Sequence, residues 1–324
     1  MLRLITQRVG QGILVLFVMS ALVFFGVYVI GDPVALLVPA DADQQDRARA
    51  IVQLGLDKPL IVQYVTFLGN AVQGDFGMSF IYRRPAIELI LERFGATVEL
   101  AVASLAIATL IGVPAGMIAG TWPKSLFSRF ATSLSVVGIS LPTFWIGISF
   151  IMLFSINLGW LPPNGRGAAG SFLGIESSLF TVDGWKHLIM PAVTLALFNL
   201  ALLMRITAAA VEKAHREDYA RYAVAKGVPK TRVLCRHIFP NISLTLITLI
   251  GLELGQLVAF AVVTESVFSW PGAGKLIIDS INSLDRPVIV CYLIFIVFII
   301  MLINLVVDLI YIIVDPRLRL GASN

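Results

Sequence analysis

The chain has 324 residues, of which 58% are hydrophobic and only 14% are charged. A soluble domain carries roughly a quarter charged residues, so the composition excludes an ordinary soluble protein and predicts an integral membrane protein. The net charge of +4 is too small for a nucleic-acid-binding surface, and the two cysteines, Cys235 and Cys291, cannot form a disulfide framework.

The N-terminal residues 1–30 predict a transmembrane helix that stays in the protein. A basic start with Arg3 and Arg8 is followed by an apolar run over 9–30. This run is long enough to cross ~30 Å of hydrocarbon, whereas the apolar part of a cleaved signal peptide is shorter. No clear cleavage site of small residues follows it.

Residues 31–97 predict a helical loop outside the cell. The stretch 41–54, DADQQDRARAIVQL, is typical of a short polar helix, and a second helix is expected to start at Pro59. The letters QGDFGMS indicate a turn. A third helix, starting at Pro85, is amphipathic, and we expect it to lie on the membrane surface.

Five further segments are long and apolar enough to span the membrane. They are 98–120, 130–157, 188–204, 242–265 and 288–313. The span 130–157 contains Pro142. The span 188–204, the fourth of the six, is short, and we expect it to continue as one longer helix into the polar residues that follow. G-x-x-x-G spacings at Gly112/Gly116 and Gly251/Gly255 allow close helix packing, either within the chain or between two copies.

Basic residues in the short loops predict the orientation. One side of the membrane carries most of them, namely Arg3, Arg8, Lys124, Arg129, Arg205, Lys213, the Lys and Arg residues of 215–240, Arg317 and Arg319. The opposite short loops carry only Arg166, Lys186, Lys275 and Arg286. Because basic short loops face the cytoplasm, we expect both termini and the loop 205–241 to be cytoplasmic.

Residues 215–240, HREDYARYAVAKGVPKTRVLCRHIFP, form a polar island in this apolar chain. Gly227 is expected to end one short helix and Pro229 to start another. One interpretation is a basic collar that sets the topology and touches anionic lipid. The aromatic residues Tyr219 and Tyr222 and the glycine break favour the other interpretation, a docking site for a cytoplasmic partner.

Catalytic chemistry is not expected in this chain. The stretch WPGAGKL at 270–276 resembles a phosphate loop, but Ser269 replaces its first glycine and Leu276 replaces its Ser or Thr. We found no metal-ligand motif and no nucleophile with a base, so no catalytic or metal-binding residue is predicted. A membrane scaffold that recruits a soluble enzyme remains a rival of another class.

Acidic residues near the spans are candidates for a transport path. Glu99 begins a span and is expected to reach water or a basic partner. Glu253 and Glu265 lie within or at the edge of the fifth span, where a charge is expensive and faces a cavity or a partner by default. For Glu253, lining a path and forming a buried structural pair are equally open.

The polar island resembles the cytoplasmic signature loop of ABC importer permeases. That loop runs E-A-A-x-x-x-G, then nine residues, then I-x-L-P. Ala223, Gly227 and Pro240 fit this pattern, whereas Arg221 and Tyr222 depart from it, as does His237. Arg221 therefore stands where the general pattern has glutamate.

Further stretches extend the resemblance over nearly the whole chain. They are MLRLITQRVGQGILVLF at the start, GDP at 31–33, GLDKPLIVQY at 55–64, GDFGMSF at 74–80, LPTFWIGI at 141–148, WLPPNG at 160–165, ESVFSWPGAGKL at 265–276 and VDLIYIIVDPRLR at 307–319. The chain is identified by these motifs as similar to the first permease of the dipeptide, oligopeptide and nickel importers.

The resemblance implies an all-α polytopic protein with six transmembrane helices and the type I ABC importer fold, with the insertion 31–97 after the first helix. The transmembrane core would be 98–313 and the cytoplasmic tail 314–324. A homologous second permease, two cytoplasmic ATP-binding subunits and an extracytoplasmic solute-binding protein would be its partners in a bacterial inner membrane. ATP and Mg would be bound by the ATPase subunits, and this chain would hold no cofactor.

The same resemblance implies two sets of site residues. The ATPase-coupling residues would be Asp218, Tyr219, Arg221, Ala223, Lys226, Gly227, Arg232 and Pro240. The translocation path and external gate would include Pro142, Glu253, Glu265 and Trp270. Peptides are the expected solute, with nickel, glutathione and oligosaccharides as alternatives, and an ion-gradient-driven transporter is the alternative mechanism.

Overall fold

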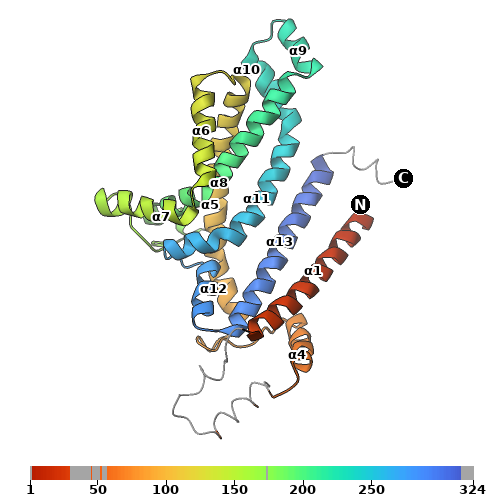
Figure 1. The fold of residues 1–324 in the computed structure, drawn as a ribbon, viewed down its shortest axis with the longest axis vertical. Helices are drawn as coiled ribbons and strands as arrows, with labels where there is room; N and C mark the ends of the chain where they lie inside the picture. The colour runs from red at the N-terminus through yellow and green to blue at the C-terminus, as the bar shows by residue number, and fades with distance from the viewer. Residues whose placement is uncertain (1, 30–44, 46–51, 53–56, 173, 315–324) are drawn as a thin grey trace. The chain divides into compact units, whose positions relative to one another are not determined.

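The computed structural model describes residues 2–29, 45, 52, 57–172 and 174–314 (Figure 1). The GDP motif at 31–33, the tail beyond Val314 and all of the polar helix expected over 41–54 except residues 45 and 52 therefore lie outside the described residues. The chain divides into two compact units, one from 1–95 with 271–301 and one from 96–270 with 302–324. Each unit is described by itself.

The first unit contains α1 (Leu2–Val29), α4 (Leu60–Val72), α12 (Ala273–Asn282) and the start of α13 (Arg286–Val314). As expected, Pro59 directly precedes α4, and Tyr64 is the residue that α4 buries. The Tyr64 hydroxyl lies 2.8 Å from the Ser20 hydroxyl of α1, and its ring centroid lies 5.3 Å from that of Phe24. α4 is thus held against α1 by one buried hydrogen bond and an aromatic cluster.

A buried carboxylate fastens the turn before α5 to the start of α13. Asp285 accepts hydrogen bonds from the Ser79 hydroxyl at 2.5 Å and from the Phe80 N–H at 3.0 Å. The expected turn at QGDFGMS is confirmed, because Gly74 and Gly77 have φ of 85° and 89°, which favour glycine. The stretch 270–276, which resembles a phosphate loop, is a turn that leads into α12.

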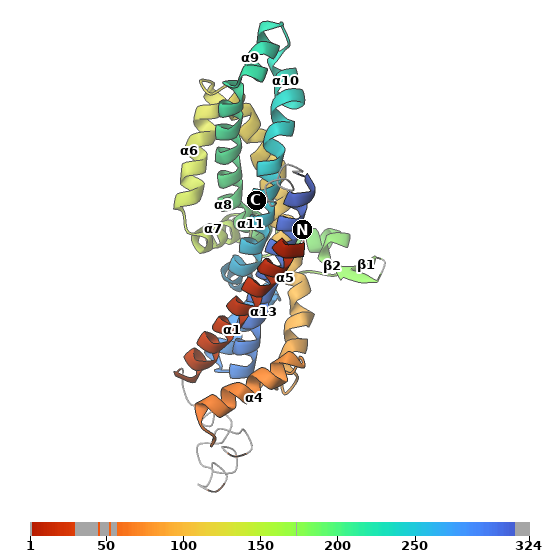
Figure 2. The same cartoon turned by 90° about the vertical axis from the view of Figure 1, so that its right-hand side faces the viewer.

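The second unit holds most of the helices. They are α5 (Ala86–Thr121) from residue 96 on, α6 (Leu126–Ser140), α7 (Thr143–Phe150), the π-helix η1 (Ile151–Asn157), the 3₁₀-helix η2 (Ser178–Phe180), α8 (Val182–His215), α9 (Asp218–Ala225), α10 (Lys230–Val233), the π-helix η3 (Leu234–Ile238), α11 (Phe239–Val267) and the end of α13. Within the described residues the only strands are β1 (Gly170–Phe172) and β2 (Ile175–Ser177), an antiparallel hairpin that projects from this unit (Figure 2).

The expected span over 130–157 is not one straight helix. α6 and the α7–η1 helix are bent by 103° relative to each other. Leu141 and Pro142 between them are extended, with ψ of 132° and 135°. Proline disfavours helical backbone at the residue before it, so Pro142 ends α6 instead of being accommodated inside a span. The described residues hold five unbroken candidate spans, or six if the bent pair counts as one.

Two expected helix boundaries also differ from the structure. The helix after Pro85 is not a separate surface helix, because it runs on without a break as the 36-residue α5. The expected boundary between 97 and 98 therefore falls inside a helix, since Gly95 costs only about 1 kcal/mol in helix propensity and nothing near it ends the helix. The expected extension of the fourth span is confirmed by α8, which has 34 residues.

A row of glycines brings the backbones of α5 and α8 into contact. Side-chain carbons added at Gly112, Gly116 and Gly120 would lie 2.8, 2.5 and 2.5 Å from the carbonyl oxygens of Leu200, Met204 and Ala208. No side chain fits there, and such close approach permits Cα–H to carbonyl contacts between helices. Of the two possibilities for the Gly112/Gly116 spacing, packing within the chain is the one observed.

Replacing Gly116 by alanine is expected to destabilise the protein, whereas Gly95→Ala in the same helix is expected to be neutral or stabilising. The added methyl at 116 meets the Met204 carbonyl and Thr207, but at 95 it meets nothing within 4 Å. Overpacking costs about 1–3 kcal/mol, while removing a helical glycine contributes up to ~1 kcal/mol. Thermal unfolding of both variants in detergent checks this, and equal shifts would contradict the close contact.

Candidate functional site

The polar island folds as a short helix at one end of α8. α8 ends at His215, and α9 starts after Glu217, whose extended backbone begins the new helix. Asp218 lies in the first turn of α9, where a negative charge is favourable. α9 buries only Ala220 and Ala223.

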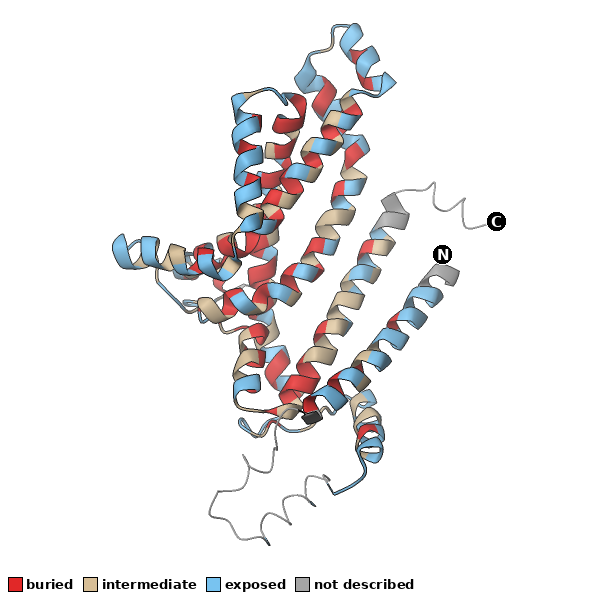
Figure 3. Ribbon diagram, viewed as in Figure 1, coloured by how far each residue is buried: buried red, intermediate tan, exposed pale blue. Residues whose placement is uncertain are grey.

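The buried alanines of α9 belong to an apolar cluster that also includes residues from both neighbouring helices. Its other members are Val113, Val211, Ala214, Val233, Leu234, Ile238, Ile242 and Leu246. Figure 3 shows the contrast between this buried base and the exposed remainder of α9. Hydrophobic burial therefore fixes α9 to the end of α8 and to the start of α11 at the same time.

Gly227 ends α9 as the sequence predicts. Its φ is 79°, its N–H donates to the Val224 carbonyl at 2.9 Å, and the Val228 N–H donates to the Ala223 carbonyl at 3.2 Å. These two bonds form a Schellman cap, which requires left-handed backbone at the glycine. A side-chain carbon at Gly227 would meet nothing within 4 Å, so backbone conformation and not space demands glycine here.

The second helix of the island is not a separate surface helix. After Pro229, α10 continues through η3 into α11, and together they form one helical segment, Lys230–Val267. Pro240 has no N–H to donate, and the wider turn of η3 carries the helix past it. Arg232 and Pro240 consequently belong to the base of a long span, while the other predicted coupling residues lie on α9 and its cap.

The exposed side of α9 combines aromatic and cationic side chains. Tyr222 is 64% exposed and Tyr219 is 39% exposed. Lys226 places its Nζ 4.5 Å from the centroid of the Tyr222 ring. At 100° per residue, Ala225 and the exposed Asp218 both lie opposite the buried alanines, with Arg221 on one side of them and Tyr222 on the other. We call Asp218, Arg221, Tyr222 and Ala225 the exposed face of α9.

A second group of site residues meets at the far end of α11. Glu265 and Trp270 are both completely buried. The indole N–H of Trp270 donates to the Ala96 carbonyl at 2.9 Å, and its backbone N–H donates to the backbone carbonyl of Glu265 at 2.8 Å. The Thr97 hydroxyl donates to the Glu265 carboxylate at 2.7 Å. Glu265 and Trp270, predicted separately, thus form one polar network that joins α11 to α5.

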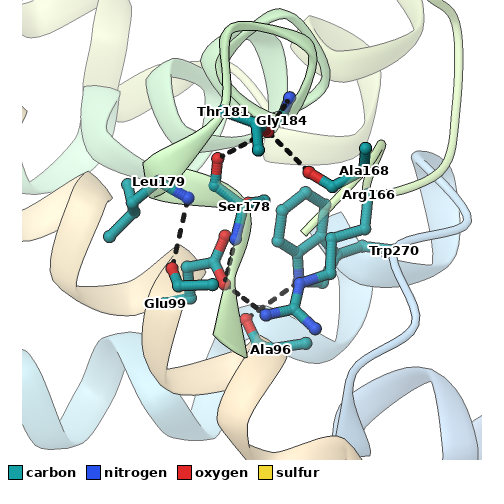
Figure 4. A network of polar contacts seen from close by, with 10 residues as sticks. Ala96, Glu99, Arg166, Ala168, Ser178, Leu179, Thr181, Gly184 and Trp270 are labelled. Atoms are coloured by element: carbon teal, nitrogen blue, oxygen red, sulfur yellow. Dashed lines mark hydrogen bonds and ion pairs between the residues drawn. The ribbon is translucent and has the colours of Figure 1, made fainter. Parts of the chain in front are cut away.

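A buried ion pair beside this network connects α5 to the loop before α8 (Figure 4). The Arg166 guanidinium lies 2.5 Å from the Glu99 carboxylate, which also accepts from the Ser178 N–H at 3.4 Å. The expected basic partner of Glu99 is therefore Arg166. The sequence gives no signal for this pairing, because 67 positions separate the two residues.

Glu253 and Pro142 occupy different positions from this network. Glu253 is 3% exposed, and its Oε2 has no hydrogen-bond partner among the described residues. It precedes Glu265 by 12 helical positions, or about 18 Å along α11. Pro142 directs α7 back towards the end of α11, where a side-chain carbon at Gly147 would lie 3.1 Å from the Phe268 ring.

These features define a polytopic helical membrane protein that presents a short polar helix at one end of its long spans. The chain belongs to the family of inner membrane components of binding-protein-dependent transport systems. Residues 112–320 match that family, and residues 1–101 match its N-terminal region. This membership confirms the prediction of an importer permease and argues against both alternatives, an ion-driven transporter and a scaffold. The family is a transmembrane permease and not an enzyme, because partner ATPases hydrolyse ATP.

Similar proteins cover almost the entire chain. It is 38% identical over 320 residues to the glutathione transport system permease protein GsiC of Escherichia coli (strain K12), covering 98% of this chain and 99% of that protein. It is also 38% identical over 333 residues to the di/tripeptide transport system permease protein DppB of Pseudomonas aeruginosa (strain UCBPP-PA14), with the same coverage.

A solved structure supports the predicted fold. The inward-facing MetNI methionine ABC transporter contains a chain that matches with a TM-score of 0.53 at 16% identity, over 71% of this chain and 97% of that chain. This likeness concerns the fold alone. The expected all-α polytopic importer fold is confirmed.

Glu99→Gln is expected to destabilise the protein by about 3 kcal/mol, because it leaves the mostly buried Arg166 charge without a counterion. The Glu99 side chain is 4% exposed and that of Arg166 is 24% exposed. The matched control is Glu92→Gln, which breaks a pair with Arg84 whose side chains are 61% and 50% exposed. Its cost should stay below ~1 kcal/mol. Thermal unfolding in detergent measures both, and a cost for Glu99→Gln as small as the control's would refute the buried pair.

Proposed function

We propose that this chain forms, together with a homologous second permease, the path by which an ATP-driven importer moves short peptides across the bacterial inner membrane. The two relatives that match it end to end are named for glutathione and for di- and tripeptides, and glutathione is itself a tripeptide. A separate solute-binding protein delivers the peptide, and two ATPase subunits bind ATP and Mg.

α9 is the contact for the ATPase in this proposal, and this helix is the observation that carries it. A helix of eight residues with two exposed tyrosines and a strict glycine cap is more structure than a basic collar requires. Its buried alanines connect it to α8 and α11 through the apolar cluster. A displacement of α9 by the ATPase would therefore move both long helices. The ATPase could favour one of two arrangements of these helices only if it contacts α9 differently in each of them.

The solute path in this proposal runs past Glu253 and is closed externally by the network around Glu265 and Trp270. Complete burial of that network and the approach of α7 to it support a gate. Pro142 would set the direction of α7. The unpartnered oxygen of Glu253 supports a path-lining position over a structural ion pair.

The orientation proposed here puts both termini and α9 in the cytoplasm and the Glu265–Trp270 network outside. The excess of basic residues around α9 supports it. The extracytoplasmic segment 31–97 would contact the solute-binding protein or the second permease. Crosslinking from Tyr82, which is 39% exposed, should capture one of the two in the assembled complex, and capture of neither would remove that role.

Gly227→Val is expected to abolish ATP-dependent peptide uptake while leaving the protein in the membrane. A β-branched residue at a φ of 79° costs about 1–2 kcal/mol or more and disrupts the α9 cap. Gly74→Val is the matched control, since Gly74 has a φ of 85° and equally open surroundings. Uptake by proteoliposomes that contain the whole complex measures both. Normal uptake by Gly227→Val would count against coupling through α9.

Labelling with a membrane-impermeant maleimide is expected to reach Cys235 only from the cytoplasmic side. Cys235 is exposed and Cys291 is buried, so the native chain offers one reactive thiol. A Cys235→Ser chain with Ser269→Cys should react only from outside, because Ser269 is exposed on the turn next to Trp270. Right-side-out and inverted vesicles separate the two cases, and the reverse pattern would invert the orientation.

A further inference from the structure

Arg221 is the cation of α9, and its side chain has no partner among the residues that the structure describes. Lys226 lies over the Tyr222 ring, and the neighbouring Arg216 pairs with Glu212 at 2.6 Å. Arg221 is exposed and makes no ion pair or side-chain hydrogen bond with any residue that the structure describes. Its guanidinium, with five donors, is therefore available to another molecule.

The position of Arg221 ensures that a docked protein would cover it. The exposed face of α9 has two short side chains at its centre, Ala225 and the exposed carboxylate of Asp218, so a partner surface can come close to the helix there. Arg221 and Tyr222 flank this centre on opposite sides. A covered guanidinium is costly unless it meets a carboxylate, whereas a covered aromatic ring is favourable without a charge.

We propose that Arg221 forms an ion pair with a carboxylate of the ATPase subunit and thereby determines which ATPase this permease accepts. The proposal rests on the proposed function and adds the charge of the partner surface to it. The docking groove would have an acidic side for Arg221 and an apolar side for Tyr222. Because the general signature has glutamate at this position, an ATPase suited to that signature would present the wrong charge here.

A lipid-bound collar makes a different demand on the same residues. Anionic headgroups attract each basic residue near the surface by a similar amount. Arg216 and Arg221 would then be interchangeable, since both are exposed and belong to the same island. An ATPase groove distinguishes them, because only Arg221 lies on the exposed face of α9 and lacks a partner.

The test compares Arg221→Glu with Arg216→Glu, two variants with the same change in net charge. Each permease is purified with its whole complex, and the amount of bound ATPase is measured across a range of salt concentrations. We expect Arg221→Glu to weaken ATPase binding on the order of tenfold to a hundredfold and Arg216→Glu to change it less than about twofold. Arg221→Gln should weaken it less and also reduce its salt dependence.

Rescue provides the decisive second measurement. An acidic residue of the ATPase changed to lysine should restore binding to the Arg221→Glu permease and weaken binding to the native one. Equal losses in the Arg216 and Arg221 variants would overturn the proposal in favour of a lipid collar, and normal binding by Arg221→Glu would exclude the ion pair. Absence of any ATPase from the native complex would instead refute the proposed function, and equal membrane levels of all variants control for folding.

Discussion

The apolar contact between α9 and the ends of two long helices is the interaction on which the functional interpretation depends. Ala220 and Ala223 are the only residues that α9 buries, and the other members of their cluster come from α5, α8, α10, η3 and α11. Small side chains let α9 lie close to these helices, and its larger side chains are left for another protein. The same two residues thus fix the helix in place and leave its opposite side free.

The far end of the second unit is held by polar contacts in addition to buried apolar side chains such as Phe268 and Trp270. Glu99 and Arg166, with Thr97 and Glu265, connect α5, the loop before α8 and the end of α11. Buried charge pairs of this kind are costly to break but add little net stability compared with apolar residues. Because hydrogen bonds and ion pairs are directional, these side chains have few alternative arrangements. This property suits an external gate, which must be either closed or open.

The sequence was sufficient to predict what local chemistry determines. The cap at Gly227, the helix start after Pro59 and the continuation of α8 into the polar residues after 204 follow from residue preferences, and all three are present in the structure. The bend at Pro142 and the continuous helix through Gly95 depend on whether packing outweighs those preferences, so their outcome was not evident. The Glu99–Arg166 pair depends on the complete fold, and no local pattern encodes it.

The length of α8 has a mechanical consequence. Its 34 residues make a rod about 50 Å long, and the base of α9 is attached at one end while η2 and Ser178 precede the other. If this rod pivots by about 5° at its α9 end, its opposite end swings by roughly 4 Å, which exceeds the length of a hydrogen bond. Glu99 could not then keep its bond to the Ser178 amide unless α5 swung along with the rod.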